Sequence, residues 1–245
     1  MTKLLILGRS GRMGQALIEA ATADSGSEVA KTHDHGENLI NAFDGVDAAI
    51  DFTVHNFTES VLDAALETNT PLVIGTTGHT DEEKAKIIEA SKKLPIVFAA
   101  NYSIGVNTLF YLTQKAAQIL GNDRFDIEVT EMHHKHKIDS PSGTARRLLE
   151  ILNEETNTSY EDDVAHGRVG NIGPRPPKEI GMHTLRGGDV VGDHTVMFAA
   201  DGERVELTHK ASSRLTFASG AVRASIWLQG RAPGLYDMQD VLGLK

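Results

Sequence analysis

The sequence predicts an α/β protein of two domains, the first built around a parallel sheet. Short apolar runs alternate with helical stretches up to about residue 104, as in strands joined by helical crossovers. After about Gly105 the strand candidates alternate apolar with polar residues, as strands with one solvated face do. The chain has 245 residues, which is long for one compact domain and sufficient for two small ones.

The first part of the chain is expected to form five buried strands. They cover residues 4–7, 27–32, 48–52, 71–74 and 96–98. Helices are expected between them at residues 15–23, 57–67 and 80–92. Thr80 can cap the last helix, and three acidic residues follow it near the positive end. This alternation predicts right-handed parallel connections, with ligands beyond the carboxyl ends of the strands.

The second part is expected to form a one-sided sheet with helices. Strands are expected at residues 125–131, 180–185, 193–199 and 204–211, and helices at 107–120, 145–154 and 215–229. Residues 157–178 are rich in Gly, Pro and charge and are expected to form a long loop. The last helix can cover the first sheet. The first domain is therefore expected to comprise residues 1–104 and 214–245, and the second residues 105–213.

Composition excludes several classes of function. The net charge is −10 and the pI about 5.5, which argues against nucleic acid or an anionic membrane as the partner. Cysteine is absent, which excludes disulfides, thiolate zinc sites and a cysteine nucleophile. The apolar run near the N-terminus is too short for a signal peptide, and no segment is long enough to span a membrane. A soluble cytoplasmic protein is expected.

The first motif is a glycine turn between the first strand and the following helix. Gly8, Gly11 and Gly14 are spaced G-x-x-G-x-x-G. Glycine there lets the backbone approach a pyrophosphate, whose charge the helix N-terminus stabilises. The spacing departs from the standard G-x-G-x-x-G pattern at its first glycine, and a plain strand–helix turn is the competing interpretation. The context favours a Rossmann-like dinucleotide site.

Asp34 follows the second strand, 20 residues after Gly14. A carboxylate at this place can hold the ribose hydroxyls of an adenosine, although a solvated loop aspartate is the plain alternative. It favours NADH, because it would repel a 2′-phosphate. Arg9, Arg12 and Lys31 can offset that repulsion, so NADH and NADPH both remain open.

The second motif is a run of five basic or imidazole side chains from His133 to Lys137, in an acidic chain. Ser142, Gly143 and Thr144 follow it at the start of a predicted helix. Backbone N–H groups there can hold a carboxylate, while Lys137 and the histidines supply charge and protons. The run is thus interpreted as an anion-binding active site.

Two other interpretations of the run remain open. A solvated loop is the plain alternative for a charge run. His134 and His136 can also ligate a metal, but no flanking carboxylate pattern supports such a site, and none is predicted.

Together these motifs resemble the dihydrodipicolinate reductases. The matching segments occur in order along nearly the whole chain: residues 8–14, 51–53, 75–78, 100–107, 131–145, 186–189, 192–194 and 209–214. The signature E-x-H-H-x-x-K-x-D-x-P-S-G-T-A, from Glu131 to Ala145, is highly specific. Ser140 departs from the family, which commonly has alanine there.

The resemblance implies a fold and a reaction. It implies a Rossmann-like dinucleotide domain closed by the C-terminal segment, and an inserted α/β substrate-binding domain that usually builds a homotetramer. The implied reaction reduces dehydrated 4-hydroxy-tetrahydrodipicolinate to tetrahydrodipicolinate, in lysine and diaminopimelate biosynthesis. NADH or NADPH gives the hydride, the enzyme gives the proton, and the partner is a small dicarboxylate substrate.

The resemblance also implies roles for individual residues. His133 would be the general acid/base and Lys137 the proton donor, while His134, Gly143 and Thr144 would bind substrate carboxylates. The residues expected to line the cofactor are Gly8, Arg9, Ser10, Gly11, Arg12, Met13, Asp34, Gly75, Thr76, Thr77, Ala99, Ala100, Asn101 and Tyr102.

Two rival functions remain at this stage. Another two-domain dehydrogenase, such as an amino-acid or semialdehyde reductase, would share the scaffold, but the 131–145 run argues against it. A dinucleotide sensor without catalysis would need the glycine turn, but not His133, Lys137 and a carboxylate cradle together. Cofactor oxidation with substrate generated by the preceding synthase separates these functions, since a sensor would bind without turnover.

Overall fold

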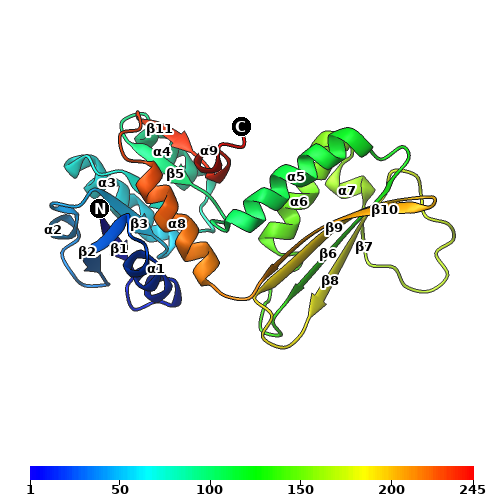
Figure 1. The fold of residues 1–245 in the computed structure, drawn as a ribbon, viewed down its shortest axis with the longest axis horizontal. Coiled ribbons are helices and arrows are strands. Elements are labelled where there is room, and N and C mark those ends of the chain that lie inside the picture. Colours follow the sequence, from blue (N-terminus) through cyan, green and yellow to red (C-terminus); the bar gives the residue numbers. More distant parts are fainter. The chain divides into compact units, whose positions relative to one another are not determined.

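The computed structural model describes residues 1–245, which form two compact units (Figure 1). The first unit comprises Met1–Ile104 and Arg214–Lys245, and the second comprises Gly105–Ser213. Each unit has its own sheet and its own hydrophobic core. The predicted fold class, a Rossmann-like parallel sheet with a second α/β part, is confirmed.

The first unit contains a six-stranded sheet in which every pairing is parallel, in the order β11-β5-β4-β3-β1-β2. Its strands are β1 (Thr2–Leu7), β2 (Ser27–His33), β3 (Ala48–Asp51), β4 (Leu72–Ile74), β5 (Pro95–Phe98) and β11 (Gly234–Tyr236). The chain runs from β1 to β2 on one side and then crosses to β3 on the other. The strand order therefore reverses between β1 and β3, where ligands bind in open α/β sheets.

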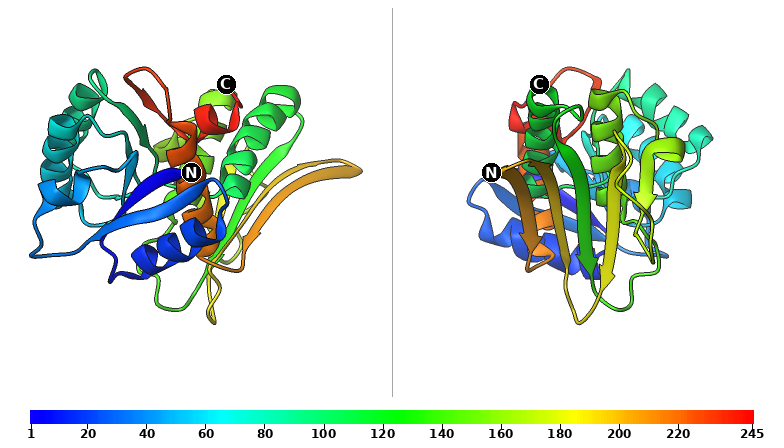
Figure 2. Two further views of the ribbon diagram at one scale, coloured as in Figure 1. Left: turned by 60° about the vertical axis from the view of Figure 1, so that its left-hand side comes forward. Right: turned by 90° about the vertical axis from the view of Figure 1, so that its right-hand side faces the viewer.

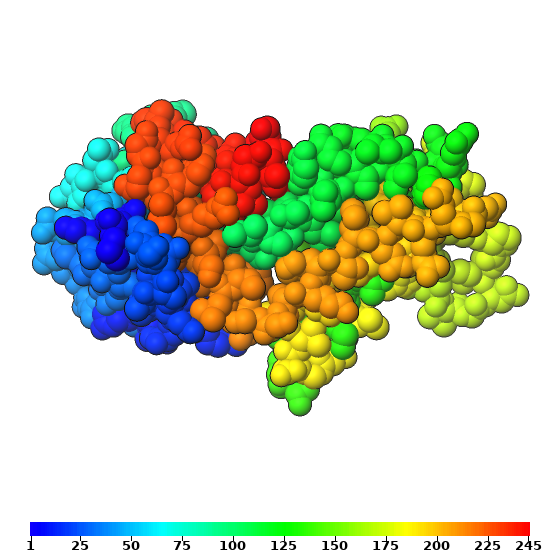
Figure 3. Space-filling view, viewed as in Figure 1, coloured from blue at the N-terminus to red at the C-terminus, as the bar shows by residue number.

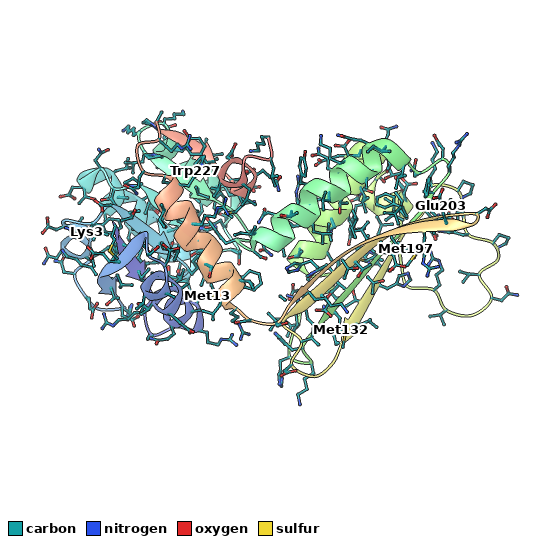
Figure 4. The ribbon with its side chains drawn as sticks, viewed as in Figure 1. Lys3, Met13, Met132, Met197, Glu203 and Trp227 are labelled. Atoms are coloured by element: carbon teal, nitrogen blue, oxygen red, sulfur yellow. The ribbon has the colours of Figure 1, made fainter.

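Helices cover both faces of this sheet. They are α1 (Arg12–Ala23), α2 (Leu39–Phe43), α3 (Thr58–Thr68), α4 (Asp81–Ser91), α8 (Leu215–Trp227) and α9 (Met238–Leu242), with a 3₁₀ turn at His55–Phe57. Alternate residues of β1 point to opposite faces. Leu4 and Ile6 pack with α1 and α8, whereas Leu5 and Leu7 pack with α2, α3 and α4. Trp227, labelled in Figure 4, lies at the end of α8.

The second unit contains a mixed five-stranded sheet, in the order β10-β9-β6-β8-β7 (Figure 2, right). Its strands are β6 (Asp126–His133), β7 (Val164–His166), β8 (Ile180–Arg186), β9 (Gly192–Ala200) and β10 (Glu203–Ala211), and its helices are α5 (Ile104–Leu120), α6 (Gly143–Thr156) and α7 (Tyr160–Asp163). The helices cover one face of the sheet and share its core. No helix covers the other face, on which the side chains of Arg168 and Arg175 bind Glu128.

Strand β6 carries the residues that connect this sheet to the second motif. Ile127 and Val129 point toward the helices and are fully buried, and Glu131 and His133 continue the same row. Residues i and i+2 of a strand lie on one face. The buried row of β6 therefore begins apolar and ends with a carboxylate beside an imidazole.

The structure corrects one prediction and adds elements that were not predicted. Residues 157–178 are not one continuous loop, because α7 and β7 lie within them. Elements of three to five residues, such as β11, α2 and α9, were also missed. Such elements are too short to show a periodicity, and they form because a neighbouring strand or helix is already in place. No helix of the protein is both long and apolar enough to cross a bilayer.

Candidate active site

The glycine turn lies at the end of β1. Gly8 has φ of +74°, a conformation that side chains with a Cβ rarely adopt. Gly14 packs so closely that a Cβ there would lie 2.1 Å from the carbonyl oxygen of Gly8. Gly11 is the N-cap of α1 and offers no side-chain cap, and the first turn of α1 has no acidic residue. These uncapped backbone amides can hold an anion.

Asp34 is connected to this turn. Its carboxylate accepts hydrogen bonds from the backbone N–H groups of Ser10 and His35, each at 3.0 Å. The hydrogen bonding of Ser10, followed by that of His35, lowers the pKa of the Asp34 carboxyl. Arg9 lies beside it but is engaged by Glu37 through two bonds of 2.7 and 2.6 Å.

Two further loops lie at the same edge of the sheet. Gly75 follows β4, and a Cβ there would lie 2.1 Å from the Phe52 ring. After β5, the buried hydroxyl of Tyr102 lies 3.0 Å from the Ile74 carbonyl oxygen and 2.9 Å from that of Val97. Burial raises the pKa of this phenol, so it remains a neutral donor. Tyr102 thereby anchors residues 99–102 to the carboxyl ends of β4 and β5.

In the second unit, the N-terminus of α6 is capped by Ser142. Its hydroxyl accepts a hydrogen bond from the Ala145 N–H at 3.2 Å, and its own N–H donates to Glu131 Oε1 at 3.2 Å. The helix begins at Gly143, and a Cβ built there would meet nothing within 4 Å. The first turn of α6 therefore has open space beside it.

Glu131 is the centre of a buried network. Its Oε2 lies 2.5 Å from His133 Nδ1, and Arg186 donates two bonds of 2.9 Å to its two oxygens. Burial raises the pKa of the Glu131 carboxyl, but hydrogen bonds from His133 and Arg186 outweigh it, and the pKa falls to about 2. The carboxylate is therefore ionised and accepts hydrogen bonds only.

His194 lies against His133, with ring centroids 5.1 Å apart and the rings nearly edge-on. It is buried, and its Nε2 lies 3.1 Å from the Ser142 hydroxyl oxygen. Burial and, to a lesser extent, the nearby His133 lower the pKa of His194 to about 3. His194 is thus neutral at ordinary pH.

The loop after β6 carries the rest of the basic run. Lys137 Nζ lies 2.8 Å from Asp139 Oδ1, and the rings of His134 and His136 lie 6.3 Å apart. Residues 187–190 lie against this loop, as Figure 3 shows in yellow and green, and the Lys135 N–H donates to the Gly188 carbonyl oxygen at 3.3 Å.

Glu131, His133 and His194 offer ligand atoms within 4.8 Å of one another. A metal there would have to displace Arg186, whose guanidinium already neutralises Glu131. The donor set therefore fits a hydrogen-bonded network better than a metal site.

The structure gathers the predicted residues into two groups. Those expected to line the cofactor lie in the first unit, at the carboxyl ends of β1, β2, β4 and β5 and at the start of α1. His133, His134, Lys137, Gly143 and Thr144 lie in the second unit, between β6 and α6.

Glu131, Arg186 and His194 lie within the segments that resemble the family, but the sequence alone predicts no role for them. For Glu131 a signal was present, because it lies two positions before His133 in a predicted strand, and such residues share one face of the strand. The register that pairs His133 with Arg186 was not readable from the sequence.

Two models of one protein family together match nearly the whole chain. The model described as "Dihydrodipicolinate reductase, N-terminus" matches residues 2–102, and "Dihydrodipicolinate reductase, C-terminus" matches residues 105–242. A 4-hydroxy-tetrahydrodipicolinate reductase of Akkermansia muciniphila is 64% identical over 244 residues, covering 100% of this chain and 99% of the relative. One of Anaeromyxobacter dehalogenans is 46% identical, with the same coverage.

Among solved structures, a dipicolinate-bound dihydrodipicolinate reductase from Paenisporosarcina sp. TG-14 has a TM-score of 0.80. It is 22% identical, and the match covers 98% of each chain. A probable dehydrogenase from Thermotoga maritima has a TM-score of 0.63 at 10% identity, covering 99% of this chain and 93% of that one. These two likenesses concern the fold.

Proposed function

Because this chain belongs to the dihydrodipicolinate reductase family, we propose that the residues between β6 and α6 carry out the reduction for which the family is named. The activity of the chain is the NAD(P)H-dependent reduction of dehydrated 4-hydroxy-tetrahydrodipicolinate to tetrahydrodipicolinate, in lysine and diaminopimelate biosynthesis. The resemblance expected from the motifs is confirmed, and the two rival functions are set aside.

The first unit is proposed to bind NADH or NADPH, which when bound supplies the hydride. The uncapped N-terminus of α1 and the glycine turn fit a pyrophosphate, since both offer backbone N–H groups without a competing acidic side chain. Asp34 would accept from the ribose hydroxyls of the adenosine. Residues 75–77 and 99–102, at the ends of the adjacent strands β4 and β5, would line the remaining part of the cofactor.

The second unit is proposed to bind the dicarboxylate. The first turn of α6 presents backbone amides and a positive helix end to the open space beside Gly143. Gly143 and Thr144 would hold one carboxylate there, and His134 would bind it from the loop after β6. The substrate is thus held at its charged ends, which leaves its ring for the proton and hydride chemistry.

His133 and Lys137 are proposed to handle protons. Hydride addition to the conjugated ring leaves negative charge, which a proton must quench. Lys137 would donate that proton as an ammonium, and His133 would act as the general acid/base. The observation that carries this proposal is the Glu131 carboxylate, which lies 2.5 Å from His133 and 3.2 Å from the Ser142 nitrogen of the α6 cap. One buried group thereby places the imidazole beside the expected carboxylate site.

The test uses wild-type protein and the His133→Ala variant, with substrate generated by the preceding synthase. Wild type should oxidise NADH or NADPH, and pyridine-2,6-dicarboxylate should compete with the substrate but not with the cofactor. His133→Ala should lower kcat by about 10²–10⁴-fold. Wild-type turnover in the variant would refute the assignment, and competition of the dicarboxylate with the cofactor would refute the division of binding between the units.

A homotetramer is also proposed, built through the face of the second unit's sheet that no helix covers. That face carries Met132 and Met197, both labelled in Figure 4, and Leu185, whose exposed fraction is 50%. The family resemblance supports a tetramer, and a sheet face that no helix covers and that carries apolar side chains supports its location.

Light scattering should give four times the chain mass of 26.5 kDa. Leu185→Glu should reduce the mass to that of a smaller species, since it places a charge on the proposed interface. A wild-type monomer would refute the tetramer. We place the enzyme in the cytoplasm, where biosynthetic reductases draw on reduced nicotinamide cofactors.

A further inference from the structure

The bonds of Glu131 all lead to groups around the proposed active site. Its side chain is fully buried and accepts from His133, from Arg186 twice, and from the Ser142 nitrogen. A buried carboxylate is costly unless it is paired and hydrogen-bonded, so the network holds its members in one geometry.

The ionised carboxylate decides which nitrogen of His133 is available. A carboxylate without a proton only accepts, so Nδ1 must carry the hydrogen, and Nε2 is then the basic nitrogen of the neutral ring. Nε2 faces Gly192, where a Cβ would lie only 2.9 Å from it. The absence of a side chain at Gly192 therefore keeps the space beside Nε2 clear.

Arg186 connects the same carboxylate to the Lys137 loop. Besides its two bonds to Glu131, it donates to the Asp139 carbonyl oxygen at 2.7 Å. Asp139 in turn pairs with Lys137 at 2.8 Å. The Glu131–Arg186 pair is thus bonded to His133, to the α6 cap and to the loop that carries the proposed proton donor.

We propose that Glu131 is a positioning residue of the reductase: it holds His133 in the tautomer and orientation that present Nε2 to the substrate, and Arg186 holds Glu131. This inference rests on the proposed role of His133. Among the direct partners of Glu131 only His133 is a proposed catalytic residue, so we expect the effect of Glu131 on turnover to pass through the imidazole.

The chain offers a matched control in the same strand. Glu128 lies on the opposite face of β6, binds Arg168 at 2.7 and 3.0 Å, and lies 2.7 Å from His183. Burial raises the pKa of its carboxyl, but hydrogen bonds from Arg168 and His183 bring it to about 2, as for Glu131. The two glutamates have similar networks, and only one of them includes His133.

The experiment is a double-mutant cycle of Glu131→Gln and His133→Ala, with Glu128→Gln as the control. Glu131→Gln should lower kcat by about 10–10²-fold, the size seen when a hydrogen-bond partner of a metal-ligating histidine is removed. In the His133→Ala background, the same substitution should change kcat by less than about 2-fold, because the imidazole through which it acts is gone. Because Glu128 lies on the face of the proposed tetramer interface, light scattering must first show that Glu128→Gln keeps the wild-type mass; it should then leave kcat within about 2-fold of wild type.

A binding measurement and a second variant separate a positioning role from loss of structure. The Kd of pyridine-2,6-dicarboxylate, measured by calorimetry, should change by less than about 5-fold in Glu131→Gln, well below the change in kcat. If that variant does not fold, Glu131→Asp keeps the charge but withdraws it from His133, and it should give an intermediate kcat.

Three results would overturn the inference. They are multiplicative losses in the double mutant, an equal kcat loss in Glu128→Gln, and full activity in both Glu131 variants. A His133→Ala enzyme with normal kcat would instead refute the proposed function itself, so the two failures are distinguishable.

Discussion

Lys137 Nζ lies 2.8 Å from Asp139 Oδ1 within the loop that joins β6 to α6. Burial raises the pKa of the Asp139 carboxyl, but the hydrogen bond from Lys137, a backbone hydrogen bond and the positive charges of Lys137 and Arg186 together outweigh it, and the net shift is downward. Because Arg186 holds the Asp139 backbone, the ammonium is oriented by a segment that is itself anchored to β8.

Asp139→Asn should therefore impair orientation of the ammonium without removing it. We expect kcat to fall by about 3–10-fold, with less change in KM, since the proposed carboxylate site remains intact. Steady-state kinetics will check this. An unchanged kcat would mean that Lys137 needs no support from Asp139.

Asp34→Ala should weaken NADH use more than NADPH use. The lost carboxylate would hold ribose hydroxyls but repel a 2′-phosphate, and the NADH loss in kcat/KM should be roughly 5–150-fold, as for a hydrogen bond to a charged group. Kinetics with both cofactors measure this ratio, and equal losses would contradict the ribose assignment.

Glu37→Gln should improve NADPH use relative to NADH. In the structure Glu37 engages Arg9 through two bonds, and this pairing brings the pKa of Glu37 to about 2. Releasing the guanidinium makes it available to a 2′-phosphate. Calorimetric Kd values for the two cofactors will check this, and an unchanged ratio would mean that Arg9 does not reach the phosphate.

Gly192→Ala should lower kcat by about 10-fold or more. The new Cβ would lie 2.9 Å from His133 Nε2, and that ring cannot shift without losing Glu131. Gly187→Ala is the matched control, because its Cβ would lie 3.2 Å from the flexible end of Met132. Similar kcat losses in both variants would show a general disturbance of the sheet.

Gly220→Ala should destabilise the first unit and weaken cofactor binding. Helix α8 approaches so closely that a Cβ on Gly220 would lie 1.8 Å from the Tyr102 carbonyl oxygen, displacing the segment expected to line the cofactor. The exposed neighbour Ser219→Ala is the control. Thermal unfolding measures the loss of stability, and the cofactor Kd measures the loss of binding. A wild-type Kd in a folded Gly220→Ala protein would show that the packing of α8 against Tyr102 does not affect cofactor binding.

The stability of the protein should fall with acid through His194. Its pKa is lowered to about 3 in the folded state, mainly by burial, so below about pH 6.5 the unfolded chain takes up a proton that the folded chain does not. The free energy of unfolding should therefore decrease by about 1.4 kcal/mol per pH unit from this group. His194→Gln should reduce the slope between pH 6.5 and 4.5 by that amount, and an unchanged slope in urea titrations would refute it.

Whether a feature of the structure can be predicted from the sequence depends on how far apart in the chain the interacting residues lie. The strands around Leu4 and Ile50 and the cap at Thr80 follow from local patterns, and the structure has them. The partners of Glu131 do not follow from local patterns. Arg186 binds Glu131, and His194 lies opposite it, only because β6 pairs with β8 and β9 in a particular register. Similarly, β11 forms by pairing with β5, which lies far earlier in the sequence.

The central claim is that the loop after β6 supplies the proton for the reduction, and Lys137→Ala tests it most directly. The control is Lys135→Ala, because Lys135 is an exposed lysine of the same loop. With substrate generated in place, Lys137→Ala should lower kcat by about 10²–10⁴-fold, change KM less, and leave the cofactor Kd nearly unaltered, while Lys135→Ala stays within about 2-fold of wild type. A raised KM with a normal kcat would contradict the claim, and the proton would then have to come from His133 or water.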